Sequence, residues 1–186
     1  MVQLPMNDKD IIALQKKGEY EQAFNAIVDT YSERLYWHLR KFIFSHDDTD
    51  DLLQEVFIKI WRALPLFRGD SQIFTWLYRI ATNEALNYMS RTKSKALVDV
   101  EVADAKISEK MDEDPYFNGT AMQRELYKAV QTLPKKQKVV FNLRYYDEMK
   151  YEDMAKITGT SVGALKASYH HAYNKVSEIL KKIFMS

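Results

Sequence analysis

Apolar residues recur at steps of three and four along most of this chain, which is the period of an amphipathic helix. The clearest run lies in residues 48–64, where one face collects the apolar side chains of Leu52, Leu53, Val56, Phe57, Ile60, Trp61 and Leu64. We expect this face to be buried. The opposite face carries Asp51, Gln54, Glu55 and Ile58. Acidic groups early in a helix suit the positive end of its dipole, so a capped core helix explains this stretch in purely structural terms.

The same period predicts helices on both sides of this run. Residues 8–44 read as a short helix and a long one separated at Gly18, and residues 45–49 as a break before the next helix. A second group of helices begins at Ala121. Because glycine and proline are scarce and alternating runs are few, the sequence predicts an all-α fold of two small helical domains.

Charge is divided unevenly between the predicted parts. Residues 1–95 hold 13 Lys/Arg and 13 Asp/Glu, whereas residues 96–119 hold 2 and 7, a net charge of −5. Residues 120–186 hold 12 and 6, a net charge of +6. We expect domains at 1–95 and 120–186, held apart by a flexible acidic linker at 96–119. A basic C-terminal domain favours a polyanionic partner, although small basic helical domains are common.

The composition of the whole chain excludes several classes of protein. The absence of cysteine excludes disulfides and thiolate chemistry and fits a reducing cytoplasm. No window approaches the roughly 18 uninterrupted apolar residues of a membrane span, and the N-terminus lacks a secretory apolar core. We therefore expect a cytoplasmic protein without direct membrane insertion.

Catalytic and metal chemistry also lack the residues they need. Asp48, Asp50 and Leu52 cannot start a calcium loop, because the third ligand position is apolar. His170 and His171 point about 100° apart on a helix and chelate poorly together. No glycine-rich phosphate loop and no supported nucleophile–base pair occurs. We expect no catalytic residues, no metal site, no cofactor and no enzyme activity.

The segment YEDMAKITGTSVGALKASYHHA has the pattern of a helix-turn-helix. It predicts a helix of about eight residues, a turn at Gly159 and a longer helix capped by Ser161. On the longer helix Val162, Leu165 and Tyr169 should pack inward. The candidates for DNA contact lie on or near its outer side, namely Ser161, Gly163, Lys166, Ser168 and His170. Small residues allow close approach to a groove, and lysine and hydroxyl groups bond phosphates or base edges.

A second candidate site surrounds the sequence FRGD in residues 67–70, between two aromatic-rich helices. Aromatic rings beside Arg68 can stack on unpaired bases, and Asn83 can hydrogen-bond a base edge. The competing interpretation is structural, because Trp76 and Leu77 are better explained as core residues.

Two stretches resemble a known family. DDLLQEVFIKIW followed by FRGDSQIFTWLYRIATN resembles the core-binding and promoter-melting region of extracytoplasmic-function sigma factors, which belong to the sigma-70 family. LPKKQKVVFNLRYYDEMKYEDMAKITGTSVGALKASYHHA resembles the region that reads the −35 promoter element. The resemblance covers about residues 20–91 and 120–180, in the family's order. It implies an alternative sigma factor that binds core RNA polymerase and directs promoter recognition, with region 2 in residues 1–95 and region 4 in 120–186.

The resemblance also implies roles for particular residues. Asp51, Gln54 and Glu55 match the face that grips a coiled coil on the polymerase β′ subunit, and the β subunit is a further expected partner. A base flipped out of the −10 element is captured in the family at positions that match Ala63, Phe67, Ile80 and Asn83 here. Such a pocket must repay a few kcal/mol of unstacking.

Two further expectations follow from the family. Its recognition helix usually carries several arginines, but this chain places Ser168, His171 and Tyr173 at the corresponding positions. The resemblance therefore does not imply which bases this helix reads. Family members are commonly silenced by an anti-sigma factor, so we expect one as a partner along with promoter DNA.

Two alternatives stay open at this point. The first is a stand-alone helix-turn-helix regulator that binds duplex DNA as a dimer, without polymerase. The second is a helical module that binds only protein. The first leaves Asp51, Glu55 and the FRGD turn without a role.

Overall fold

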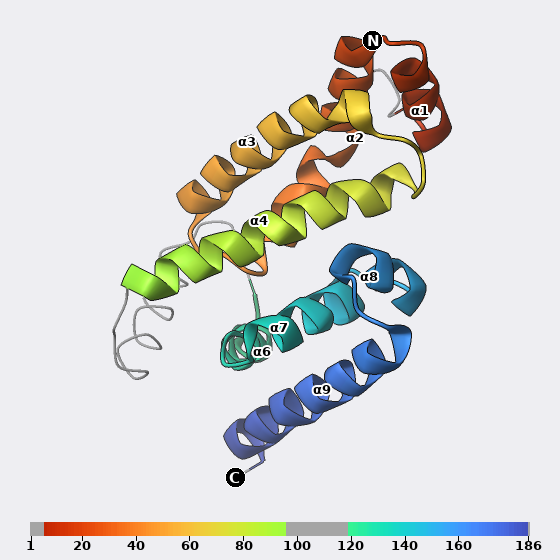
Figure 1. The fold of residues 1–186 in the computed structure, drawn as a ribbon. Helices are drawn as coiled ribbons and strands as arrows, with labels where there is room; N and C mark the ends of the chain where they lie inside the picture. The colour runs from red at the N-terminus through yellow and green to blue at the C-terminus, as the bar shows by residue number, and fades with distance from the viewer. Residues whose placement is uncertain (1–5, 96–118, 186) are drawn as a thin grey trace.

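The computed structural model describes residues 6–95 and 119–185, and in these residues every regular element is a helix (Figure 1). The first unit contains α1 (Asp8–Lys16), α2 (Tyr20–Arg40), α3 (His46–Ala63), the 3₁₀ turn η1 (Leu64–Leu66) and α4 (Ile73–Lys95). The second contains α6 (Ala121–Gln131), α7 (Lys135–Phe141), the π-helical turn η2 (Asn142–Tyr146), α8 (Tyr151–Thr158) and α9 (Val162–Phe184). The predicted all-α class and its two domains are confirmed. The predicted linker lies outside the described residues except for Gly119.

The core of the first unit forms where α2, α3 and α4 pack together. Apolar residues spaced three and four apart supply it, including the fully buried Leu35, Leu52, Val56, Ile60 and Leu77. The preference for Trp76 and Leu77 as core residues is confirmed, because they are 7% and 0% exposed. Burial of such side chains contributes about 1.5–3 kcal/mol each and is the main source of stability in a helical unit of this size.

Two local predictions about the first unit were wrong. Trp61 is 45% exposed rather than buried, because the predicted apolar face is wider than the face that neighbouring helices cover. Its ring centroid lies 5.2 Å from that of Phe24, which is itself only partly buried. The predicted break at residues 45–49 is also too long, since α3 begins at His46. Ser45 is the N-cap, and its Oγ accepts a hydrogen bond from the Asp48 N–H at 3.3 Å.

The second unit contains the predicted helix-turn-helix, formed by α8 and α9. Gly159 ends α8 with φ of 68°, a left-handed conformation that favours glycine. Ser161 caps α9 by accepting a hydrogen bond from the Ala164 N–H at 3.3 Å. Leu165 is fully buried and Tyr169 is partly buried, so the predicted inward face is confirmed.

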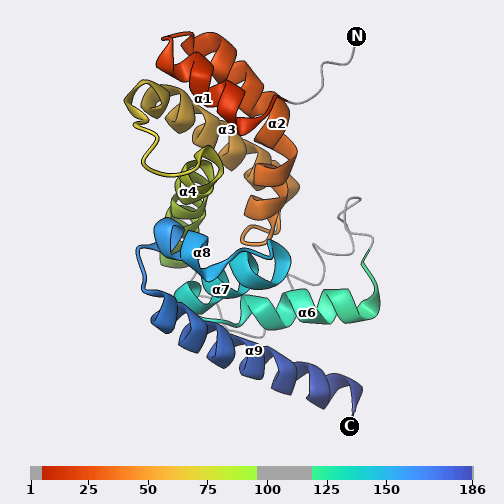
Figure 2. The same cartoon turned by 90° about the vertical axis from the view of Figure 1, so that its right-hand side faces the viewer.

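The two units lie against each other rather than apart. Helix α8 packs on α4, and Figure 2 shows α7 and α8 directly below the first unit. Residues of both units share one apolar core, including Leu77 and Ala81 from α4 and Met154 and Ile157 from α8. The expectation that the domains are held apart was therefore wrong for this conformation, because the sequence pattern reports each helix face but not which unit covers it.

Candidate functional site

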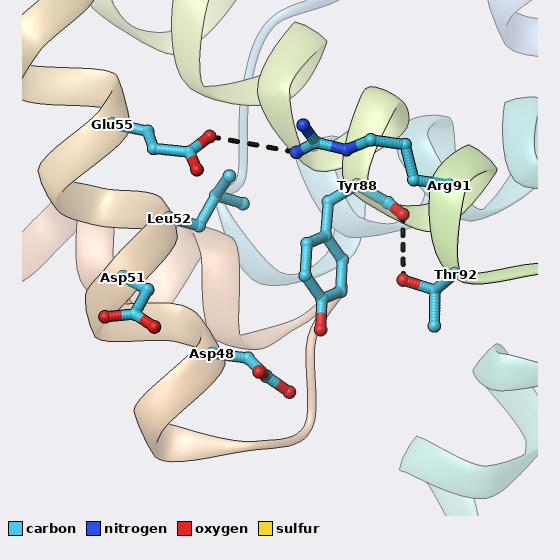
Figure 3. A pocket seen from close by; sticks show the side chains of 7 residues that line it. All are labelled: Asp48, Asp51, Leu52, Glu55, Tyr88, Arg91 and Thr92. Atoms are coloured by element: carbon cyan, nitrogen blue, oxygen red, sulfur yellow. Dashed lines mark hydrogen bonds and ion pairs between the residues drawn. The ribbon is translucent and has the colours of Figure 1, made fainter. Parts of the chain in front are cut away.

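An acidic pocket opens between α3 and α4 (Figure 3). It is a cavity of about 480 Å³ whose lining is Asp48, Asp51, Leu52, Glu55, Tyr88, Arg91 and Thr92. The helical step of three and four places the first four on one side of α3. The spacing of the last three does the same on α4. The pocket therefore brings together two of the three predicted polymerase-binding residues, Asp51 and Glu55.

Charge in this pocket is predominantly negative. Three carboxylates face one guanidinium, and the nearest approach is 3.7 Å between Glu55 Oε2 and Arg91 Nη2. Burial and a hydrogen bond to the Asp48 carboxylate raise the pKa of Tyr88 above its usual value. The neutral phenol donates its one proton to Asp48, so it is not a free donor toward the pocket. Such a pocket suits a cationic side chain from a partner.

An exposed apolar strip continues from this pocket along α3. Gln54, Ile58 and Trp61 follow at steps of four and three, and all three are exposed. Ile58 is 51% and Trp61 is 45% exposed. Tryptophan beside charged residues is typical of the energetic centre of a protein interface. The apolar period of α3 predicts Trp61 in the core, whereas its spacing from Gln54 and Ile58 places it on this exposed face.

The five residues predicted to contact −10 DNA differ in accessibility. Arg68 and Asn83 are exposed, and Ala63 and Ile80 are partly buried. Phe67 is only 8% exposed, and its ring centroid lies 4.9 Å from that of Trp76. The Gln15 side chain donates a 3.0 Å hydrogen bond to the Phe67 carbonyl, which fixes the start of the turn. Arg68 and Asn83 are thus the two members of this set that present polar groups to the outside.

Most of the residues predicted to contact −35 DNA are accessible on α9. Ser161, Gly163, Lys166 and His170 are exposed, whereas Ser168 is partly buried. The Lys166 ammonium lies 5.7 Å from the centroid of the Tyr151 ring on α8. A Cβ built on Gly163 meets no atom within 4 Å. The fold itself therefore does not require a glycine at this position.

A second cavity, of about 540 Å³, lies between the two units. Asn83 and Leu86 of α4 form one side, and Lys136 and Val139 of α7 contribute to the other. The start of α9 contributes Ala164, Leu165 and Ser168. This cavity contains Asn83 but none of the other four residues predicted to contact −10 DNA. Instead it joins Asn83 to a residue predicted to contact −35 DNA, which the sequence analysis did not foresee.

The described residues contain neither a metal-binding group nor a membrane-spanning helix. No group of three or more His, Asp or Glu side chains in residues 6–95 and 119–185 is arranged to hold a metal ion. Over the same ranges, none of the helices has both the length and the apolar character needed to cross a membrane.

Comparisons with known proteins match both units. The Sigma-70 region 2 family model matches residues 27–95, and the Sigma-70, region 4 model matches residues 123–176. The chain is 29% identical to the ECF RNA polymerase sigma-E factor of Escherichia coli (strain K12), over 95% of this chain and 98% of that protein. It is 30% identical to the RNA polymerase sigma-H factor of Pseudomonas aeruginosa, over 95% of each chain.

A solved structure matches as well. The sigma factor RpoE of Bartonella quintana, crystallised in complex with the anti-sigma factor NepR, is 25% identical to this chain. The two align with a TM-score of 0.65 over 85% of this chain and 96% of that chain.

Proposed function

The chain belongs to the extracytoplasmic-function sigma factors of the sigma-70 family and is an alternative sigma factor that directs transcription initiation, and we propose how its two units divide this task. Residues 1–95 bind core RNA polymerase and stabilise melted −10 DNA, residues 96–119 are the linker, and residues 120–186 read the −35 duplex. The observation that carries the proposal is the match of region 2 and region 4 to separate units in the family's order.

The polymerase contact in this proposal is the acidic pocket together with the exposed apolar strip that continues from it along α3. Asp51 and Glu55 accept hydrogen bonds from basic side chains of the β′ subunit, and Gln54 contributes from the same face of α3. Support comes from the excess of carboxylates over cations in the pocket and from the exposure of Trp61 further along α3. Charged groups steer the approach of the partner. The exposed apolar strip then becomes buried against the partner once the two proteins are docked.

The −10 contact uses the end of α3, the FRGD turn and α4. Arg68 contacts the phosphate backbone or stacks on a base, and Asn83 hydrogen-bonds a base edge. Ala63, Phe67 and Ile80 form the apolar walls against which a flipped base packs. The close packing of Phe67 on Trp76 supports a preformed wall, which lowers the cost of capturing an extruded base.

The −35 contact is the N-terminal half of α9. Lys166 reaches a phosphate, and Ser161, Ser168 and His170 face base edges or sugars. Gly163 allows the helix to approach the groove closely. Its position supports this role, because glycine within a helix costs about 0.5–1 kcal/mol relative to alanine and nothing in the fold requires it here.

The partners of the proposed factor follow from these contacts. The chain works in the cytoplasm, where promoter DNA and the β and β′ subunits are found. An anti-sigma factor covers its polymerase-binding face, a proposal supported by the RpoE relative that was crystallised with NepR. The chain performs no catalytic step and needs no cofactor, since RNA synthesis belongs to the polymerase.

The test is capture of core RNA polymerase by the purified chain, run beside binding of duplex DNA by the chain alone. Capture of polymerase with weak DNA binding by the free chain is the expected result. Tight sequence-specific duplex binding without polymerase capture would favour a stand-alone helix-turn-helix regulator. If the chain neither captures polymerase nor binds duplex DNA, a module that binds only other proteins would be favoured.

A further inference from the structure

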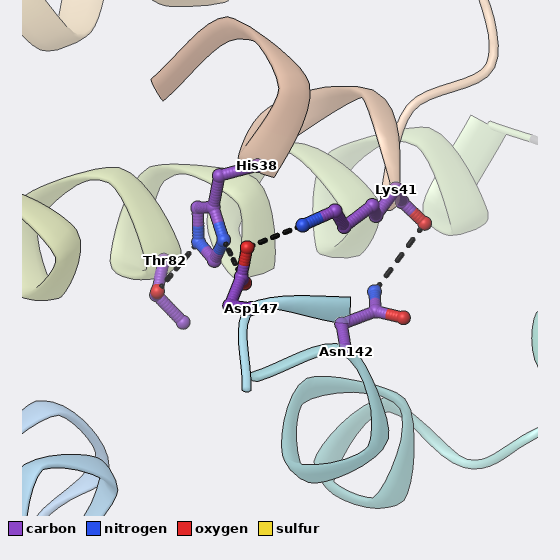
Figure 4. A network of polar contacts seen from close by, with 5 residues as sticks. All are labelled: His38, Lys41, Thr82, Asn142 and Asp147. Atoms are coloured by element: carbon purple, nitrogen blue, oxygen red, sulfur yellow. Dashed lines mark hydrogen bonds and ion pairs between the residues drawn. The ribbon is translucent and has the colours of Figure 1, made fainter. Parts of the chain in front are cut away.

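A buried polar cluster joins the two units at His38 of α2 (Figure 4). His38 is 0% exposed, and its Nδ1 donates a hydrogen bond to Oδ2 of Asp147 at 3.0 Å. Its Nε2 lies 2.9 Å from Oγ1 of Thr82 on α4, so both ring nitrogens are used. The ammonium group of Lys41 donates to the other carboxylate oxygen of Asp147. One carboxylate of the second unit is thus held by two side chains of the first.

Further hydrogen bonds between the units surround this cluster. The Lys41 carbonyl accepts from Gln131 Nε2 at 3.3 Å and from Asn142 Nδ2 at 3.4 Å. Lys135 donates from Nζ to Ser90 Oγ at 2.7 Å. These bonds come from three elements of the second unit. Because hydrogen bonds are directional, they fix the orientation of the second unit on the first, which apolar contact alone would not do.

The environment of Asp147 shows that the charged form is stabilised. Burial acts to raise the pKa of this carboxyl, but the hydrogen bond and charge of His38, together with the charge of Lys41, lower it below its usual value. A carboxylate held in this way is costly to leave without partners in a low-dielectric site. Loss of the cluster should therefore loosen the contact between the units.

The docked arrangement conflicts with simultaneous reading of two promoter elements. Asn83 and Ser168 line the same cavity, so their surfaces face each other across it. The −10 and −35 elements are separated by about 25 base pairs, or about 85 Å of duplex at 3.4 Å per base pair. Two surfaces that share one cavity cannot reach both elements at the same time.

We propose that His38, Lys41 and Asp147 form a latch that keeps region 4 closed on region 2 in the free chain, and that the latch must open before the promoter is engaged. This inference rests on the proposed DNA-binding surfaces. In a closed–open equilibrium, apparent affinity for DNA equals the intrinsic affinity reduced by the open fraction. A variant that opens the latch therefore gains apparent affinity without any new contact to DNA.

The distance between the units tests the latch directly. The chain contains no cysteine, so cysteines introduced at the exposed positions Glu33 and Glu178 take spin labels specifically. Double electron–electron resonance on the full chain should give one narrow distance that agrees with the docked structure. Asp147→Asn should broaden the distribution and lengthen it. Lys41→Met, which removes one of the two partners from the other side, should do the same to a smaller extent.

A binding measurement adds the functional consequence. The probe is a fluorescein-labelled duplex from a promoter that the chain transcribes with core polymerase. Asp147→Asn should bind it about tenfold or more tightly than the wild-type chain, because breaking a buried ion pair shifts the equilibrium strongly. Glu152→Gln is the matched control, since it removes the same charge from an exposed position of α8. The control should change affinity less than Asp147→Asn and leave the distance unchanged.

The outcomes separate the latch from the proposed function. Unchanged distance distributions in both Asp147→Asn and Lys41→Met, with unchanged helical content, would overturn the latch while leaving transcription intact. Equal affinity gains in Asp147→Asn and Glu152→Gln would also overturn it, because charge alone would then explain the gain. Absence of promoter-directed transcription by the wild-type chain would instead overturn the proposed DNA surfaces, whatever the measured distances.

Discussion

Glu55 of α3 and Arg91 of α4 face each other across the acidic pocket, with 3.7 Å between Oε2 and Nη2 (Figure 3). Their side chains are 51% and 61% exposed, so water screens the pair and it adds little to folding stability. A pair that the fold does not need can exchange partners at low cost. A basic side chain of another protein can therefore replace Arg91 beside Glu55, which is the basis of the polymerase contact proposed above.

Removal of both carboxylates should weaken polymerase binding without affecting the fold. We expect Asp51→Asn with Glu55→Gln to reduce affinity for core polymerase by about a hundredfold or more, since each of the two charge-assisted hydrogen bonds contributes about 1.5–3 kcal/mol and about 1.4 kcal/mol is a factor of ten. A titration followed by fluorescence anisotropy measures the affinity, and circular dichroism measures helical content. The control is Glu21→Gln with Glu33→Gln, at two exposed positions of α2. Equal weakening in the control would show that net charge, rather than the pocket, attracts the polymerase.

Substitution of Gly163 should separate stability from DNA binding. Because a Cβ there meets nothing within 4 Å, Gly163→Ala should raise the free energy of unfolding, by less than the roughly 0.5–1 kcal/mol of a helix-interior position because Gly163 lies in the first turn of α9. The same methyl group should weaken binding to promoter duplex by blocking close approach of α9. Urea unfolding and a gel-shift titration give the two quantities. Gly159→Ala is the comparison, and it should destabilise because its φ is 68°. Unchanged DNA affinity in Gly163→Ala would contradict the docking of this face.

Lys166 should act through phosphate rather than through a particular base. Lys166→Ala is expected to weaken duplex binding to a similar degree for all sequences and to lower the salt dependence of log K by about one unit. Measurements at several salt concentrations provide the slope. Lys175→Ala, at an exposed position further along α9, should leave both affinity and slope nearly unchanged. A loss confined to one promoter sequence would instead assign Lys166 to direct base reading.

The contribution of Asp147 to stability should depend on pH in a defined direction. Burial acts to raise its pKa, but His38 and Lys41 lower the folded-state value below the usual 3.8. A carboxyl group whose pKa is lower in the folded chain than in the unfolded chain stabilises the fold. This contribution is fully present when the pH is above the pKa of the unfolded chain, and it is lost as the pH falls through the pKa of the folded chain. Tyr78 also faces the cluster and stays neutral here, because burial and then the Asp147 charge raise its pKa to about 12. The stability advantage of wild type over Asp147→Asn should therefore be larger at about pH 5 than at about pH 3. An advantage that grows on acidification would contradict the assigned charge state.

Periodicity predicted the helices well because each one buries a stripe of its own side chains. The cap at Ser161, the turn at Gly159 and the inward face at Leu165 are local features, and all three are confirmed. The same rule failed at Trp61, where the apolar face extends past the helices that cover it. A single sequence reports how apolar a helix face is but not how much of that face a neighbour reaches.

Contacts between the two units could not be predicted from the sequence. His38 and Asp147 are 109 positions apart, and no motif spacing relates one to the other. Their pairing depends on the three-dimensional path between two separately folded units, on which helix periodicity carries no information. The predicted roles in DNA contact came from the helix-turn-helix pattern, from the chemistry of the side chains and from family resemblance. The shared cavity of Asn83 and Ser168 became visible only in the structure.

Reconstituted transcription tests the central claim most directly. The purified chain is added to core RNA polymerase with a library of promoter fragments, and the 5′ ends of the transcripts are mapped. We expect starts at defined positions downstream of shared −10 and −35 sequences, and we expect Asp51→Asn with Glu55→Gln to abolish them. Transcripts with the same pattern as core polymerase alone, from a chain that binds duplex DNA tightly by itself, would contradict the division of promoter recognition between region 2 and region 4.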